Sequence, residues 1–131
     1  MIEGGCLCGA VRYRLGEAPS SSVNCHCRSC RRASGAPVVA WITVRRPQFT
    51  ILSGVPAVFH SSPGVTRRFC SHCGTGLTYE SERHPHTIDV TSASLDDPEA
   101  YPPTADVLLE DKLSWQATSP HTEKFAGFSS G

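Results

Sequence analysis

The sequence lacks a net charge, a long apolar run and an export signal. Its 12 lysines and arginines balance its 12 aspartates and glutamates, so no excess charge attracts nucleic acid or a membrane surface. No apolar run approaches the roughly 20 residues of a membrane span. The first residues, Met1 to Cys6, contain neither a basic nor an apolar signal region. We therefore expect a cytoplasmic protein with no nucleic-acid and no membrane partner.

The chain is also short. Its 131 residues are typical of one domain, and a hydrophobic fraction of 39% is enough for a modest core. We expect a single domain over residues 1–131, with a core at about 4–115. The tail at 119–131 is expected either to pack through Phe125 and Phe128 or to fray.

Short apolar segments between turn residues predict a mainly β fold. Val11, Tyr13 and Leu15 alternate with other residues, which predicts one buried face of a strand at 10–15. The segment 28–34 predicts one or two helical turns that end at Gly35. Further strands are expected at 37–44, 49–52, 58–61, 65–70, 76–80 and 87–91.

Cysteine, in contrast, is abundant and clustered. The seven cysteines form three groups: Cys6 and Cys8; Cys25, Cys27 and Cys30; and Cys70 and Cys73. An odd number leaves one thiol over from a full set of disulfides, and two cysteines one residue apart bridge poorly. In a reducing compartment such clusters are typical of metal binding or catalysis. Disulfides and inert buried thiols are the weaker alternatives.

The first and last groups together predict a closed zinc site. Cys70 and Cys73 form a Cys-x-x-Cys turn, and the following Gly74 allows the positive φ that such a turn needs. Cys6 and Cys8 lie two positions apart, so in an extended segment their side chains share a face. Four thiolates complete the tetrahedron of a structural Zn²⁺, which makes the metal part of the fold.

The middle group predicts an open zinc site. Its three thiolates leave one coordination position for water or a substrate. Arg28, Arg31 and Arg32 lie within and just after this group. Their charges would lower the thiol pKa values and could hold the carboxylates of an anionic substrate.

Other interpretations of the middle group stay open. A second structural zinc would need a non-cysteine ligand, for which the candidates are His26, His60, His72, His84, His86 and Asp89. The three thiols are also compatible with a resting protein that carries no metal. A zinc-stabilised binding module without catalysis would use these arginines, with Arg45 and Arg46, to face an acidic partner.

The cysteine motifs resemble those of the GFA family, which includes the glutathione-dependent formaldehyde-activating enzyme and centromere protein V. The resemblance runs from about Gly4 to Trp115 and rests on the segments 5–13, 25–31, 34–37, 69–74 and 95–98. It implies a mainly β fold of the Mss-four-like (β-tent) kind, with small zinc-bound antiparallel sheets and short helical turns. It also implies a structural zinc on the first and last groups and a catalytic zinc on the middle one.

The activity that the resemblance implies is that of a carbon–sulfur lyase. Such an enzyme interconverts S-hydroxymethylglutathione with glutathione and formaldehyde, so the expected partner is a small-molecule thiol. Arg28, Arg31 and His26 are candidates for substrate binding, and His26, His60 or a water would carry the proton. Many relatives have a histidine where this chain has Asp106. If that histidine shapes the substrate pocket, the enzyme acts on a different thiol adduct.

Overall fold

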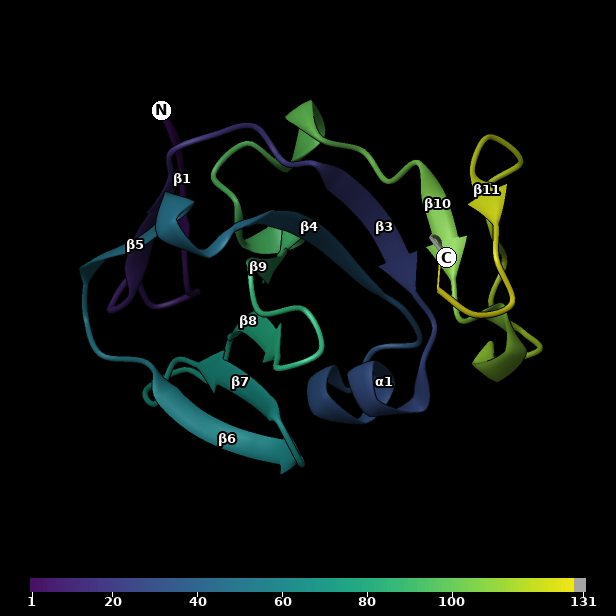
Figure 1. The fold of residues 1–131 in the computed structure, drawn as a ribbon, viewed down its shortest axis with the longest axis horizontal. Coiled ribbons are helices and arrows are strands. Elements are labelled where there is room, and N and C mark those ends of the chain that lie inside the picture. Colours follow the sequence, from purple (N-terminus) through teal and green to yellow (C-terminus); the bar gives the residue numbers. More distant parts are fainter. Residues whose placement is uncertain (129–131) are drawn as a thin grey trace.

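The computed structural model describes residues 1–128, which form two β-sheets, one α-helix and short 3₁₀ turns (Figure 1). The smaller sheet has the strand order β1-β2-β5, and the larger one the order β11-β10-β3-β4-β9-β8-β7-β6. The mainly β fold that the sequence predicts is therefore confirmed, although β10 pairs in parallel with β3 and β11, so the larger sheet is mixed and not antiparallel throughout. No helix in the described part of the chain has the length and apolar character to cross a membrane.

Most of the strands follow one another with short connections, but longer segments precede β10 and β11. The smaller sheet contains β1 (Ile2–Gly5), β2 (Arg12–Leu15) and β5 (Phe49–Ser53). The larger sheet contains β3 (Ser21–Cys25), β4 (Val39–Arg45), β6 (Ala57–Ser62), β7 (Val65–Phe69), β8 (Gly76–Ser81), β9 (Thr87–Thr91), β10 (Ala105–Val107) and β11 (Glu123–Lys124). The helix α1 spans Arg28–Ser34, and 3₁₀ turns span Arg46–Gln48, Ser92–Ser94, Pro98–Ala100 and Leu109–Asp111.

The main core lies between the two sheets. Tyr13 and Leu15 of β2 pack with Ile42 and Val44 of β4 and Val90 of β9, and each is at most 1% exposed. Since side chains alternate between the faces of a strand, these residues form one inward face on each sheet. Burial of side chains of this size stabilises the fold by about 1.5–3 kcal/mol each.

The opposite face of the larger sheet carries a second cluster. Because side chains alternate along β4, that of Trp41 points away from the main core, and it packs with Ala105 and Val107 of β10. The same cluster includes Cys25, at the end of β3, and Cys30 of α1. The middle group of cysteines is therefore built on this second face.

Several predicted elements are confirmed, and the tail packs in part. The helix has the predicted bounds and ends at Gly35, which has a φ of 70°. Phe125 packs against the second cluster, whereas Phe128 is 71% exposed. Residues 129–131, the end of the predicted tail, lie outside the described residues. The strands β1, β3, β10 and β11 were not expected, because each is short and lacks a clear apolar alternation.

A methyl group at Gly4 should destabilise the fold. A Cβ there would overlap Tyr13 Oη and lie 2.5 Å from the Ser94 carbonyl oxygen. The two residues are already in close contact, because Tyr13 Oη is 2.6 Å from Ser94 Oγ. We expect Gly4→Ala to lower the free energy of unfolding by about 1–3 kcal/mol, the usual effect of overpacking. Urea unfolding in zinc-containing buffer measures it. Gly76→Ala is the control, because a Cβ there has no neighbour within 4 Å; equal midpoints for the two variants would contradict the expectation.

Candidate metal centre

The seven cysteines carry free thiols that converge in two groups. In each group the sulfur atoms lie within 4.8 Å of one another. The four-cysteine site consists of Cys6, Cys8, Cys70 and Cys73, and the three-cysteine site of Cys25, Cys27 and Cys30. The pairing of the first and last sequence groups, which lie far apart in the chain, is thus present in the fold.

The four-cysteine site has the dimensions of a metal tetrahedron. The Sγ of Cys8 lies 3.7 Å from that of Cys6 and 3.7 Å from that of Cys70. Four sulfurs about 2.3 Å from a central Zn²⁺ have edges of about 3.8 Å. Backbone N–H groups also donate to the sulfurs, from Val11 to Cys6 at 3.3 Å and from His72 to Cys70 at 3.4 Å. These donors stabilise thiolates, so the residues fit a bound cation.

Thr75 supports the same site, although the sequence analysis did not single it out. Its hydroxyl lies 3.2 Å from Cys73 Sγ and lowers the pKa of Cys73 to about 5. The backbone N–H of Leu7 donates to the same hydroxyl oxygen at 3.1 Å, which ties the first cysteine group to the last. A hydroxyl two residues after a Cys-x-x-Cys turn is the only sequence signal for this role.

The three-cysteine site is formed where β3 passes into α1. Cys27 is the N-cap of the helix, and its sulfur accepts a hydrogen bond from the backbone N–H of Cys30 at 3.2 Å. Hydrogen bonds with Cys25 and Cys30 lower the pKa of Cys27 to about 2. The bond with Cys27, together with burial, raises the pKa of Cys25. Three sulfur atoms that lie within 4.8 Å of one another also fit a thiophilic cation such as Zn²⁺.

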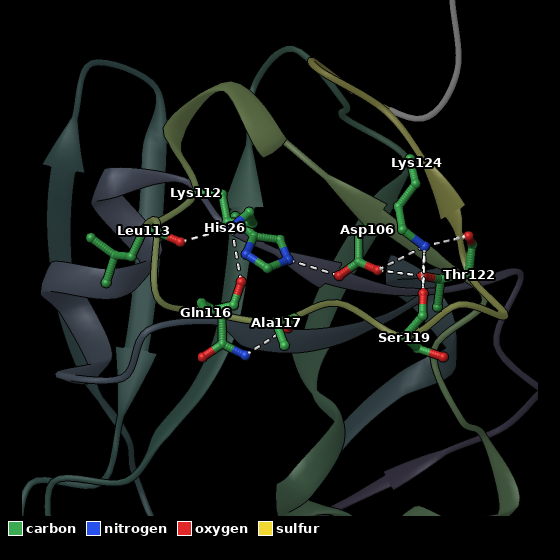
Figure 2. A network of polar contacts seen from close by, with 9 residues as sticks. All are labelled: His26, Asp106, Lys112, Leu113, Gln116, Ala117, Ser119, Thr122 and Lys124. Atoms are coloured by element: carbon green, nitrogen blue, oxygen red, sulfur yellow. Dashed lines mark hydrogen bonds and ion pairs between the residues drawn. The ribbon is translucent and has the colours of Figure 1, made fainter.

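No fourth ligand joins the three-cysteine site among the described residues. His26 is only 1% exposed, and its Nε2 lies 2.7 Å from Asp106 Oδ1 rather than at the thiols (Figure 2). His60 is exposed and contacts Thr66. Asp89 accepts a hydrogen bond from the Thr43 hydroxyl at 2.6 Å. The three thiols therefore leave room for a further ligand.

A cavity of about 760 Å³ adjoins the three-cysteine site. Cys30 forms part of its wall, and Arg28 and Arg32 of α1 line the same side. Trp41 of β4 and Phe59 of β6 contribute aromatic surface. A cavity of this volume, largely apolar and with a few charged groups, is typical of a small-molecule site.

Arg67 of β7 is a cationic residue of the cavity that the sequence did not predict. It lines the cavity, its Nη2 lies 3.9 Å from Cys30 Sγ, and its guanidinium lies 4.9 Å from the centre of the Tyr79 ring. Its neighbour Arg68 also lines the cavity, and the Arg68 side chain forms an ion pair with Glu80. Consecutive residues of a strand point to opposite faces of the sheet, so one of two adjacent arginines must face each side. This Arg-Arg pair was the signal in the sequence that an arginine side chain would lie beside the three-cysteine site.

The remaining predicted residues divide between the cavity and other surroundings. Arg28 lines the cavity, as does Arg32. The Nη2 of Arg31 lies 3.4 Å from the carbonyl oxygen of Asp111, and Arg31 is not among the lining residues. Asp106 is 1% exposed, and its carboxylate is directed at His26 instead of the cavity. Although burial opposes it, hydrogen bonds from Thr122 and His26 hold the pKa of Asp106 below its usual value.

Three comparisons relate the chain to known proteins. A family model described as "Glutathione-dependent formaldehyde-activating enzyme" matches residues 1–111. A Halomonas elongata protein named "Putative glutathione-dependent formaldehyde-activating enzyme" is 28% identical over 140 residues, which covers 98% of this chain and 88% of that protein. A crystal structure of a Rhodobacter sphaeroides protein is similar with a TM-score of 0.61 and 25% identity, over 72% of this chain and 87% of that one.

Replacing Asp89 should stabilise the protein at neutral pH. Burial raises the pKa of Asp89, although the Thr43 hydroxyl donates to it. A carboxyl whose pKa is higher in the folded state binds more protons there, so it disfavours folding as the pH rises through that range. We expect Asp89→Asn to raise the melting temperature at pH 7. The gain should shrink as the pH falls toward about 3.9, the pKa of an unfolded aspartate.

Thermal unfolding at a series of pH values measures this difference. Asp97→Asn, at an exposed position, is the matched control and should give parallel curves with the wild type. A gain that is the same at every pH, or a loss of stability at pH 7, would contradict the assignment.

Proposed function

The chain belongs to the glutathione-dependent formaldehyde-activating enzyme (GFA) family, and from that premise we propose that it is a zinc-dependent carbon–sulfur lyase. Its substrate would be an adduct of a small thiol and an aldehyde, such as S-hydroxymethylglutathione. The observation that carries the proposal is the three-cysteine site at the wall of a cavity that is lined by arginines.

The two thiol groups would have different roles. Cys6, Cys8, Cys70 and Cys73 would hold a structural zinc, because four thiolates close the coordination sphere. Cys25, Cys27 and Cys30 would hold the catalytic zinc, which when bound keeps a sulfur ligand in the thiolate form or polarises an aldehyde oxygen.

The cavity would bind and orient the thiol. Arg28, Arg32 and Arg67 place positive charge around its wall, which attracts carboxylates such as the two of glutathione. Arg67 lies beside Cys30, so it would draw the negative end of the substrate toward the thiols. Trp41 and Phe59 would cover the adduct and reduce its contact with water.

The reaction would join or separate one carbon–sulfur bond. In the synthetic direction the thiolate sulfur attacks the carbonyl carbon of formaldehyde, and the π electrons move to the oxygen, which takes one proton. In the reverse direction the hydroxyl loses its proton, the carbonyl re-forms and the thiolate leaves. His26 is buried and does not line the cavity, so we assign the proton transfer to a water molecule.

The setting of the enzyme is a further part of the proposal. A reducing compartment such as the cytoplasm keeps thiols free, which suits the seven unpaired cysteines. We propose that the chain acts there as a single domain on a small molecule, without a nucleic-acid partner, in keeping with its zero net charge.

The two cysteine sites should respond differently to the loss of one ligand. We expect two zinc ions per wild-type chain, and one in Cys27→Ala, which should stay folded and lose all activity. Cys73→Ala should fail to fold, because structural zinc contributes about 10–16 kcal/mol, as much as the net stability of a domain. Elemental analysis, circular dichroism and NMR detection of the glutathione–formaldehyde adduct measure the three properties.

Two results would overturn this assignment. Activity retained in Cys27→Ala would remove the three-cysteine site from the chemistry. A wild-type chain with one zinc and no activity after zinc is added would favour the binding module over the enzyme.

Arg67 should contribute to the recognition of charged thiols. Removal of one charge-assisted hydrogen bond costs about 1.5–3 kcal/mol, so Arg67→Met should raise KM for glutathione roughly 10- to 100-fold. KM for 2-mercaptoethanol, which has no carboxylate, should change much less. Steady-state kinetics with both thiols test this, with exposed Arg83→Met as the control. An equal change in KM for both thiols would count against a carboxylate contact.

A further inference from the structure

A polar network links His26 to the C-terminal segment through Asp106 (Figure 2). His26 lies between Cys25 and Cys27, and neighbouring residues of an extended segment point to opposite sides. Its ring is therefore turned from the thiols, and Nε2 donates to Asp106 Oδ1 at 2.7 Å. The side chains of His26 and Asp106 are 1% and 2% exposed, so little solvent competes with this bond.

The C-terminal segment orients the carboxylate of Asp106 from the other side. The hydroxyl of Thr122 donates to Oδ2, and Lys124 Nζ lies 3.9 Å from the same oxygen. The backbone N–H of Phe125 donates to the Asp106 carbonyl at 3.0 Å. Both oxygens of the carboxylate thus have partners, and these partners come from two distant parts of the chain.

Backbone hydrogen bonds also join His26, the β10 segment and the C-terminal segment. The N–H of His26 donates to the Val107 carbonyl at 3.1 Å, and β10 pairs with β3 so that Val107 lies opposite Cys25. Leu108 has a φ of 56°, a left-handed conformation that a residue with a Cβ adopts only where its surroundings hold it. Its N–H donates to the Gly127 carbonyl at 2.8 Å, so the C-terminal segment holds it in place.

We propose that Asp106 is a positioning residue for the three-cysteine site, that it acts through His26, and that the segment 119–127 completes this support. The proposal rests on metal binding at the three-cysteine site, as in the proposed function. A fixed His26 fixes the segment that carries two of the three thiols, so the thiols converge before a metal arrives. Preorganised ligands bind a metal more tightly, and groups outside the ligand set produce this effect in many metal sites.

Two observations distinguish the positioning role of Asp106 from a role in substrate binding and from the part of the chain that the family model matches. Asp106 does not line the cavity, so its replacement changes no wall that a substrate would touch. Thr122 and Lys124 lie beyond residues 1–111, which the family model matches. The support from the C-terminal segment therefore comes from residues outside the part of the chain that the family model matches.

Zinc release to a colorimetric chelator, measured on the full-length zinc-loaded protein without substrate, tests the proposal. We expect two phases, and the phase that is absent in Cys27→Ala belongs to the three-cysteine site. Asp106→Ala should accelerate that phase about 10- to 100-fold, the range for groups that support metal ligands. Asp106→Asn, which keeps an acceptor but no charge, and Thr122→Val should have smaller effects in the same direction.

The phase of the four-cysteine site is the internal control for folding, and it should not change. Asp96→Asn is the matched control, because its carboxylate pairs with Arg12 on the surface. If Asp106 acts through His26, Asp106→Ala should add nothing in a His26→Gln background. An unchanged phase, equal acceleration of both phases, additive effects in the double variant or a wild type that releases one zinc would overturn the proposal. Since no substrate is present, a protein without lyase activity still gives a decisive result.

Discussion

Cys8 and Cys70 lie 62 positions apart in the chain, yet their sulfur atoms are 3.7 Å apart, and the rest of the structure depends on this closure. The contact joins the turn after β1 to the turn between β7 and β8. It therefore holds the smaller sheet against the larger one, with the main core between them. A metal bound by these four cysteines would stabilise a chain with short strands and a modest core, because the unfolded state has no preformed site.

The larger sheet uses its two faces for different purposes. The alternation of side chains places Ile42 in the main core and Trp41 in the cluster next to the three-cysteine site. In the same way the side chain of Arg68 pairs with Glu80, while that of Arg67 lies beside Cys30. A shift of one residue in strand register would exchange these roles. The core that fixes the register thereby also fixes the residues that face the cavity.

The three-cysteine site is local in sequence but is supported from far along the chain. Its thiols come from the end of β3 and the start of α1, whereas its surroundings come from β7, β10 and the C-terminal segment. The side facing the cavity carries arginines, and the other side carries His26 and Asp106. The site thus has one side open to the cavity, where we propose that a thiol binds, and one buried side, which we propose holds the ligands in position.

The sequence by itself determined the elements whose causes are local. Helix α1 ends where Gly35 allows a left-handed turn, and the division of seven cysteines into four and three follows from the ligand number of zinc. Only the tertiary structure decided that Arg67 lies beside Cys30, that Thr75 supports Cys73 and that Asp106 meets His26. These contacts depend on how strands pair across long separations. Local periodicity carries no information about such pairing, because many registers bury similar apolar area.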